Sequence, residues 1–470
     1  MNSLTPLHAL ASNANDANSV VKIIVCGGGL GGLTFARSLF FLRDAQVSAG
    51  QSLPEISITI LERDASSVER EAQGYSLSLR ADKIGGGIQA LERIGLLDDI
   101  RKGAAPGHRF VMANKQFVPY LEIPPGSTVP SNDPNKSPLP INIRVARKFL
   151  RNTLLDSLPA DRCTVQWGAH AIEANVFSNE NGKEQVSVTL ASGEVLESDL
   201  LIVADGANSS IRRYLFPHER LEFAGCVAYI ASTVHPDGLP KPFADGVVFG
   251  MSGEGHAVLV APVDETKMSF SVSYRSEKKI ENEFRGDRKP LTDEELEHFR
   301  TVALKHTQGY GYQSELKSFI ANADPKTIRV INAQDMKPHT NSTTNPQIIL
   351  IGDAAHAVSP FAGNGANMAI MDGFELAEQL LSVKHGKDLV AAVKMYDKHS
   401  IARCNRTRGM SHFNISVLHS KGLNHRCMIT LFKLLGNFLV RPKTSIAVAC
   451  TVVLVPVGLI TGLVLWNNNK

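Results

Sequence analysis

Three glycines near the start of the chain, Gly27, Gly29 and Gly32, have the spacing G-x-G-x-x-G. They follow an apolar run, 20–26, and precede a stretch that is typical of a helix. Glycines here let a pyrophosphate approach the backbone, and the free N–H groups of the next helix start carry partial positive charge. The spacing therefore predicts a dinucleotide site. The alternative is a glycine-rich turn in an α/β protein that binds no nucleotide.

A carboxylate follows at the end of the next apolar run, 56–61, where Glu62 is placed to accept hydrogen bonds from ribose hydroxyls. It lies about thirty residues after Gly32 rather than about twenty, and an inserted loop between them accounts for the difference. A carboxylate repels a 2′-phosphate, so Glu62 argues against NADP as the ligand of this site. The planar guanidinium of Arg63 is suited to stacking on adenine.

Two later apolar runs end in a glycine and an aspartate. The run 200–204 leads into Asp205 and Gly206, and the run 348–351 leads into Gly352, Asp353 and a glycine-rich loop. Asp205 has two interpretations: it contacts a cofactor, or it caps the helix that we expect from about Asn208.

Composition excludes several classes of protein. The 470 residues are enough for two or three domains, and 49 basic against 46 acidic residues leave no basic stripe of the kind that a nucleic-acid binder shows. The six cysteines lie far apart without a C-x-x-C pair, so we predict neither a disulfide framework nor a metal site, and a reducing compartment suits them.

The elements that must position these residues indicate an α/β fold. We expect a Rossmann-like, discontinuous nucleotide-binding domain with an inserted, mainly antiparallel β-sheet domain for substrate. The boundaries that we predict are a disordered tail at 1–19, the nucleotide-binding domain at 20–100, 143–220 and 345–400, the substrate domain at 101–142 and 221–344, and C-terminal helices at 401–445.

An uncharged apolar run extends from Ile446 to Trp466. As a helix it would span about 31 Å, close to the hydrocarbon core of a bilayer. Because Arg441 and Lys443 precede it, the sequence predicts a transmembrane helix and a single-pass C-terminal anchor with the catalytic body facing the cytosol. A hydrophobic hairpin broken at Pro456 and buried against the body is the alternative.

Together the three glycine-containing motifs resemble those of the flavoprotein monooxygenases of the p-hydroxybenzoate hydroxylase type (group A), which carry them in this order. The resemblance covers roughly residues 20–400. Within the family the chain is most similar to tetracycline-inactivating and fungal biosynthetic flavin monooxygenases. The shared segments are 61–64, 70–79 and the G-D-A-A-H-x-x-x-P-F-A-G-x-G-A-N sequence from Gly352.

This resemblance implies FAD as the cofactor and assigns its contacts. The three glycines of the first motif and Glu62 would hold the ADP half, Arg147 the phosphate-ribose portion, and Asp353 the ribityl or pyrophosphate region. The backbone N–H groups of Gly365, Ala366 and Asn367 would meet the flavin pyrimidine ring, where a helix start stabilises the negative charge of reduced flavin.

Three further residues complete the site that the resemblance implies. Gly74, in the segment 70–79, belongs to the cofactor-binding set. His356 is read as a positioned loop residue rather than as a general base. Pro360 would pack near the edge of the isoalloxazine that faces substrate.

The activity that follows from the resemblance consumes NADPH or NADH and O2. A flavin C4a-hydroperoxide would hydroxylate or epoxidise a lipophilic small molecule, with Baeyer–Villiger insertion also open, and secondary-metabolite biosynthesis is the expected setting. Some relatives carry an arginine where this chain has Ile230, so we expect no charged anchor for the substrate. The alternatives are a flavin dehydrogenase or prenyl reductase without O2 chemistry, and a membrane-anchored flavin-fold protein without turnover.

Overall fold

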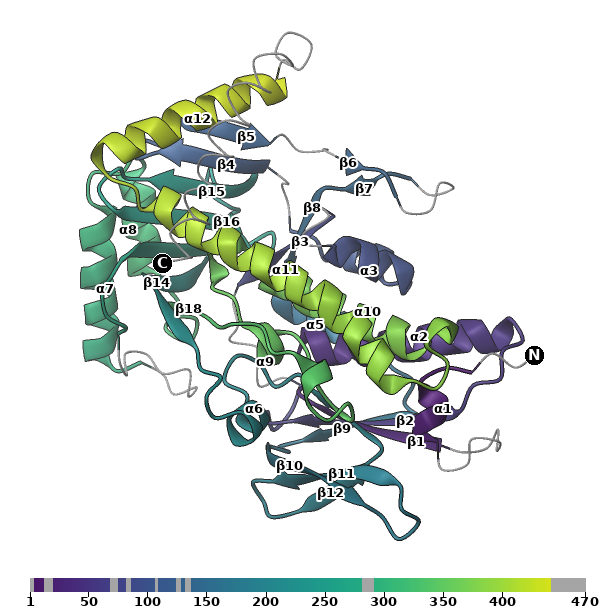
Figure 1. The fold of residues 1–470 in the computed structure, drawn as a ribbon. Helices are drawn as coiled ribbons and strands as arrows, with labels where there is room; N and C mark the ends of the chain where they lie inside the picture. Colours follow the sequence, from purple (N-terminus) through teal and green to yellow (C-terminus); the bar gives the residue numbers. More distant parts are fainter. Residues whose placement is uncertain are drawn as a thin grey trace.

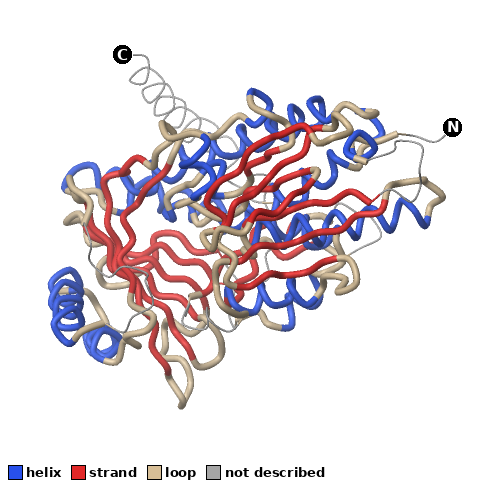
Figure 2. The backbone as a smooth tube through the Cα atoms, turned by 90° about the horizontal axis from the view of Figure 1, so that it is seen from below, coloured by secondary structure: helices blue, strands red, loops and turns tan. Residues whose placement is uncertain are grey.

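A computed structural model of the chain describes residues 4–11, 20–67, 75–81, 86–105, 109–123, 128–131, 137–280 and 291–440. Two large sheets dominate it (Figures 1 and 2). One is parallel and carries the three glycine motifs, and the other is mainly antiparallel. The α/β class that we predicted is confirmed.

The parallel sheet has five strands, and each pairing in it is parallel. Its central strands are apolar along most of their length because both faces of the sheet are covered. In spatial order the strands are β19 (Ile348–Leu350), β13 (Leu200–Val203), β1 (Val20–Cys26), β2 (Glu55–Glu62) and β9 (Cys163–Trp167).

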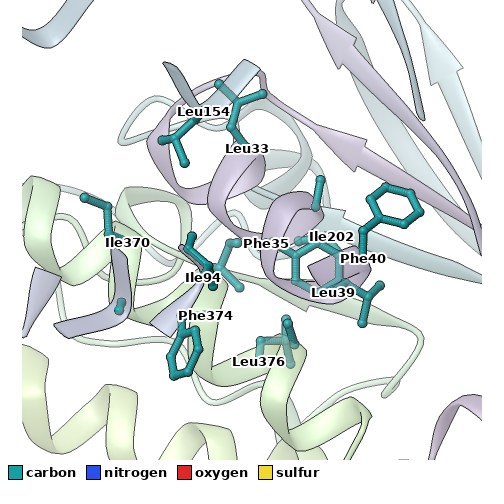
Figure 3. Close-up of a cluster of buried hydrophobic side chains, with 14 of the residues drawn as sticks. Leu33, Phe35, Leu39, Phe40, Ile94, Leu154, Ile202, Ile370, Phe374 and Leu376 are labelled. Carbon is teal, nitrogen blue, oxygen red and sulfur yellow. The ribbon is translucent and has the colours of Figure 1, made fainter. Parts of the chain in front are cut away.

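Helices cover one face of this sheet and a small antiparallel sheet covers the other. Helix α2 (Leu30–Ser48) and helix α10 (Gly365–Leu380) pack closely, because a Cβ on Gly373 would lie 2.6 Å from the carbonyl oxygen of Gly31. Figure 3 shows the core that they share with the sheet. The opposite face packs on β10 (Ala171–Ser178), β11 (Glu184–Leu190) and β12 (Val195–Ser198).

The second sheet has seven strands and is antiparallel except where β15 pairs with β4. Helices α7 (Asp293–Thr307) and α8 (Gln313–Ala321) cover one of its faces. Its order is β18 (Arg329–Asp335), β14 (Glu222–Val234), β17 (Lys267–Arg275), β16 (His256–Pro262), β15 (Gly246–Met251), β4 (Arg109–Asn114) and β5 (Pro119–Ile123).

Smaller elements connect the two sheets. Two ribbons pair β3 (Ser76–Arg80) with β8 (Asn142–Ala146) and β6 (Thr128–Val129) with β7 (Leu139–Pro140). The remaining helices are α3 (Gly87–Arg93), α4 (Leu97–Lys102), α5 (Arg147–Asp156), α6 (Ser210–Leu215), α9 (Asp353–His356), η2 (Asn341–Thr343), η3 (Pro360–Ala362), η4 (Val383–His385), α11 (Leu389–Leu418) and α12 (Gly422–Val440).

The N-terminal residues differ from the disordered tail that we expected. Residues 7–10 form a short helix, α1 (Leu7–Leu10), and the side chains of Leu7 and Leu10 are buried in the core around the parallel sheet. Their i, i+3 spacing puts both on one helix face, so burial of apolar surface orders this segment.

The membrane anchor requires a correction. Among the described residues, no helix is long and apolar enough to cross a membrane. Helix α12 contains Arg426 and Lys433 and packs against β5, and the run 446–466 lies outside the described residues. A span needs about 20 predominantly apolar helical residues. We therefore withdraw the prediction of a single-pass anchor with a cytosol-facing body.

Candidate functional site

The three motifs meet at one edge of the parallel sheet. The N–H of Gly27 donates to the carbonyl of Leu61 (2.8 Å), and the N–H of Ala204 donates to the carbonyl of Cys26 (2.8 Å). Because β13 also pairs with β19, the segment after Leu350 ends at the same edge. This is the carboxyl edge, where open α/β sheets bind their ligands.

The glycines of the turn between β1 and α2 have different surroundings. Gly27 has φ +112°, and a Cβ there would lie 2.4 Å from the carbonyl oxygen of Ala204. A Cβ on Gly32 would lie 2.3 Å from the carbonyl oxygen of Gly27, whereas around Gly29 the described structure leaves open space within 4 Å. Packing thus requires the first and third glycines, and the second leaves room for a pyrophosphate at the start of α2.

Glu62, at the end of β2, stabilises this turn through hydrogen bonds. Its buried Oε2 accepts a hydrogen bond from the N–H of Gly28 (3.0 Å), and its Oε1 accepts one from the N–H of Asp64 (3.1 Å). An ionised carboxylate has about four acceptor positions, so these bonds are compatible with a further bond to a hydroxyl. The neighbouring Arg63 is exposed.

Arg151 is a residue of this site that our sequence analysis missed. Its Nε donates to the carbonyl of Gly28 (2.8 Å), its Nη2 lies 3.7 Å from Glu62 Oε2, and its guanidinium lies over the ring of Trp167. Arg151 follows Arg147 by one helical turn in α5, so the two share a helix face. That i, i+4 spacing was the signal in the sequence.

Asp353 lies beside the start of α10. Its side chain is solvent-accessible. The surrounding protein nevertheless desolvates the carboxyl group and raises its pKa, and this effect exceeds the lowering of the pKa by the positive charges of His356 and Arg147. A Cβ on Gly365 would lie 3.9 Å from Asp353 Oδ1. The structure thus brings Arg147, Asp353 and Gly365 together.

Helix α10 begins at Gly365, and the side chain of its N-cap residue, Asn364, makes no capping bond. The N–H groups of Gly365, Ala366 and Asn367 belong to the first turn, where they have no intrahelical partner. The side chain of Asn367 is bonded to β3, because it accepts from the N–H of Arg80 (2.9 Å) and donates to the carbonyl of Ser78 (2.8 Å). Another predicted cofactor ligand, Gly74, lies outside the described residues.

Asp205 makes a capping contact. Its Oδ2 accepts from the N–H of Ser210 (3.0 Å), the first residue of α6, and the N-cap residue Ser209 accepts from the N–H of Arg212. The helix thus begins two residues later than we expected. Arg212 donates to the carbonyl of Ala354 (2.8 Å), which ties the segment after β13 to the segment after β19.

His356 belongs to a buried ionic network centred on Asp372. Its Nε2 lies 2.5 Å from Asp372 Oδ2, which also accepts from the N–H of Gly352 (2.8 Å), and Asp372 Oδ1 accepts from Arg403 (2.7 Å). Burial would lower the pKa of His356, but the Asp372 carboxylate outweighs it and raises the pKa. Burial likewise opposes ionisation of Asp372, yet His356 and Arg403 hold its pKa well below the usual range.

Asp372 and Arg403 were not predicted from the sequence either. An aspartate within the otherwise apolar stretch Met368–Phe374 was the available signal, because a carboxylate in a buried helix face needs a charged partner. Within the described residues no group of three or more His, Cys, Asp or Glu is arranged to hold a metal, and the side-chain partners of Asp372 include His356 and Arg403.

The loop that follows α9 reaches the seven-stranded sheet. Pro360 is exposed and begins η3, and the next residue, Phe361, packs beside Met251 and Ala257 on the sheet face away from α7 and α8. Strand β17 shows the two faces by alternation, since Phe270 and Val272 are buried under those helices and Ser271 points to the face where Phe361 lies.

A row of half-buried side chains crosses this face of the sheet. The strand register places them next to one another, and all but one are apolar. In order they are Ile230, Ser271, Leu259, Phe249, Met112 and Leu121.

A comparison with known protein families matches residues 20–408 to the FAD binding domain family. The chain belongs to this family. A fungal relative, monooxygenase cfoF of Aspergillus candidus, is 27% identical over 412 residues, which cover 86% of this chain and 92% of that protein.

Solved structures share the fold. HpxO from Klebsiella pneumoniae, complexed with FAD and uric acid, matches with a TM-score of 0.64 at 19% identity and covers 88% of this chain and 92% of its own. Tetracycline destructase Tet(51) matches with a TM-score of 0.59 at 16% identity and covers 89% and 98% of the two chains.

Family membership confirms the predicted resemblance. The protein is an FAD-dependent oxidoreductase of the group A flavin monooxygenase type with FAD as its cofactor, and NAD(P)H is the co-substrate typical of that family. The turn at Gly27–Gly32, with its open second glycine, and the uncapped start of α10 fit such a cofactor.

Proposed function

We propose that this enzyme uses NADPH or NADH and O2 to hydroxylate or epoxidise a lipophilic small molecule. The observation that carries the proposal is the apolar row on the seven-stranded sheet next to Phe361. Ile230, where some relatives have an arginine, lies in that row, so the row lacks a cation that would favour a charged substrate.

The cofactor contacts that we propose follow the motifs. Gly27, Gly29 and Gly32 would receive the pyrophosphate, Glu62 would add a ribose hydroxyl to its backbone partners, and Arg63 would stack on adenine. Arg151 stabilises this arrangement through its hydrogen bond to the carbonyl of Gly28 and its ion pair with Glu62.

At the other half of the cofactor we propose Arg147 and Asp353 for the ribityl and phosphate region. The N–H groups of Gly365, Ala366 and Asn367 would meet the flavin ring, with Pro360 shaping its substrate side. For Asp205 the bond to Ser210 favours the helix cap, and the burial of His356 against Asp372 favours a positioning role.

FAD, when bound, supplies the redox chemistry with nicotinamide and O2. The chain would bind and orient the cofactor at the carboxyl edge of the parallel sheet, present an apolar surface to the substrate and exclude water from it. A place in secondary-metabolite biosynthesis remains part of the proposal.

The test uses the full-length protein purified with FAD. We expect an absorption band near 450 nm that NADPH or NADH bleaches without oxygen and that air restores. Apolar aromatic and isoprenoid compounds should then stimulate NAD(P)H oxidation coupled to O2 uptake and gain one oxygen atom by mass spectrometry. Bleaching without O2-dependent product would instead favour the dehydrogenase or prenyl reductase, and a protein that takes up no FAD would contradict the proposal.

A further inference from the structure

Helix α11 connects the two sheets of the molecule. It is 30 residues long and extends from η2 and α10, beside the parallel sheet, to the seven-stranded sheet (Figure 1). Its beginning and its end therefore pack on different layers of the enzyme. A helix of this length spans about 45 Å at 1.5 Å per residue.

Three polar side chains on one face of α11 bind the loop at η3. Thr407 accepts from the Nδ2 of Asn364 (3.0 Å), and Asn414 donates from its Nδ2 to the carbonyl of Phe361 (2.8 Å). Between them Ser411 donates to the carbonyl of Ser359 (3.1 Å). The spacing i, i+4, i+7 aligns the three on one helix face, so the helix holds the loop at three points.

The bonds are buried or nearly so, which makes them costly to lose. Thr407 and Ser411 are buried, Asn414 is half-buried, and Asn364 is 1% exposed. Within the described structure the Oδ1 of Asn364 has no hydrogen-bond partner, so the bond to Thr407 orients this amide. A buried polar group that loses its partner bears the cost of its desolvation.

The end of α11 is fixed to the seven-stranded sheet beside the same loop. His419 donates from Nδ1 to the carbonyl of Ile415 (2.8 Å), so its Nε2 is the acceptor for the hydroxyl of Ser273 (2.9 Å). The His419 ring also packs edge-on against Phe361. One helix thus sets the position of the loop relative to the sheet face that carries the apolar row.

We propose that Asn414, with Thr407 and Ser411, forms a clamp that holds the segment 359–364 in the conformation that the flavin half of FAD requires. They are positioning residues, since they act through the loop. The inference rests on the proposed placement of the flavin at the loop and the start of α10. It deepens that proposal by assigning the preorganisation of the loop to side chains of α11.

The clamp has a measurable consequence for cofactor affinity. If a loop is only partly in its competent conformation, the apparent dissociation constant equals the intrinsic one divided by the competent fraction. Loss of one such hydrogen bond should weaken FAD binding about fivefold. ADP, which would occupy only the glycine turn and Glu62, should bind as before.

The experiment compares Asn414→Leu with Asn405→Leu in the full-length holoenzyme. The control places the same substitution on the same helix, at an exposed asparagine. FAD release on dilution is followed by flavin fluorescence and gives the dissociation constant, and competition with ADP gives the affinity of the other half of the site. Thr407→Val, which keeps the shape of the side chain and removes the acceptor, provides a second variant should Asn414→Leu fold poorly.

We expect Asn414→Leu and Thr407→Val to release FAD more readily, with unchanged competition by ADP and with Asn405→Leu like the wild type. Equal FAD affinity in all four proteins would overturn the clamp while leaving the proposed function intact. Parallel losses of FAD and ADP affinity would overturn it too, because they indicate general destabilisation. Failure of the wild type to bind FAD would instead contradict the proposed function.

Discussion

Each glycine in the turn between β1 and α2 has its own physical role. Gly27 needs a left-handed backbone and has no room for a side chain, whereas Gly29 has an ordinary φ of −87° and open space. The first is thus a requirement of the fold, and the second is the position where a ligand would approach the backbone. Single substitutions should separate the two roles.

We expect Gly27→Ala to lower the free energy of unfolding by at least about 3 kcal/mol, because strain at positive φ adds to the contact with Ala204. Gly29→Ala should leave that free energy within about 0.5 kcal/mol of the wild type but weaken FAD binding tenfold or more, about 1.4 kcal/mol. Denaturant unfolding without added FAD and flavin fluorescence titration measure the two effects. Unimpaired FAD binding by Gly29→Ala would contradict the role that we give this turn.

Asp372 is the charged centre of the network under the loop after β19. Removal of its carboxylate in Asp372→Ala leaves Arg403 and His356 buried without their shared partner, and this should cost about 3–5 kcal/mol of the free energy of unfolding. Glu375 also pairs with Arg403, but without Glu375 this guanidinium keeps its bond to Asp372, so Glu375→Ala, the control, should cost only about 1 kcal/mol, the worth of one hydrogen bond. Denaturant unfolding of both variants checks this, and similar losses would argue against the central role of Asp372.

Among the elements, strand β17 contributes alternate side chains to the two faces of the seven-stranded sheet. Its buried residues Phe270 and Val272 pack under α7 and α8, and Ser271 lies in the row on the other face, between Ile230 and Leu259. This face should take substrate if the proposed function holds, and the cofactor contacts lie on other elements. A bulky side chain at position 271 should therefore affect substrate binding and not FAD binding.

We expect Ser271→Trp to reduce substrate-stimulated NADPH oxidation about tenfold or more, since an indole fills the space above the row. The FAD dissociation constant should stay within about twofold of the wild type, and Ser271→Ala should behave like the wild type in both assays. Oxygen uptake and flavin fluorescence measure the two quantities. Full stimulation in the tryptophan variant would show that the substrate does not use this face.

For the molecule as a whole, buried and half-buried histidines whose pKa values are shifted in opposite directions set the response of stability to pH. Desolvation lowers the pKa of His306 on α7 and of His419 at the end of α11 to about 4. His356, by contrast, has a raised pKa because of Asp372, although burial alone would lower it. Histidines with a lowered pKa therefore change the stability below the ordinary histidine pKa of about 6.5, and His356 changes it above that value.

We expect stability to be greatest near pH 6.5. Below pH 6.5 His306 and His419 bind a proton in the unfolded chain but stay neutral in the folded protein, so the free energy of unfolding falls as the pH drops from about 6.5 to 4. For His419 this loss is on the order of 3 kcal/mol. Above about pH 6.5 the folded chain keeps the proton of His356 that the unfolded chain releases, so stability falls as pH rises through the folded pKa of His356. Thermal unfolding from pH 4 to 9 tests both signs.

Variants assign the two slopes of that profile. His419→Asn should flatten the acid side, and His356→Gln should flatten the alkaline side while lowering stability throughout. An alkaline slope that is unchanged in His356→Gln would mean that another group titrates there.

Local patterns in the amino-acid sequence were enough to predict the parallel strands, the glycine turn after β1 and the place of Glu62 at the end of β2. These depend on neighbours in the chain: apolar runs that must be buried on both faces, and a glycine where the backbone must turn with positive φ. The order of the three motifs was also enough to predict the family.

The residues that support the site from distant parts of the chain became visible in the three-dimensional structure. Arg151 meets Gly28, Arg403 meets Asp372, and α11 meets the loop at η3, each through contacts between segments far apart in the chain. The structure also showed that Leu7 and Leu10 are buried. Such pairings depend on how layers pack and not on local propensity, because a side chain carries no signal of its partner until the fold brings the two together.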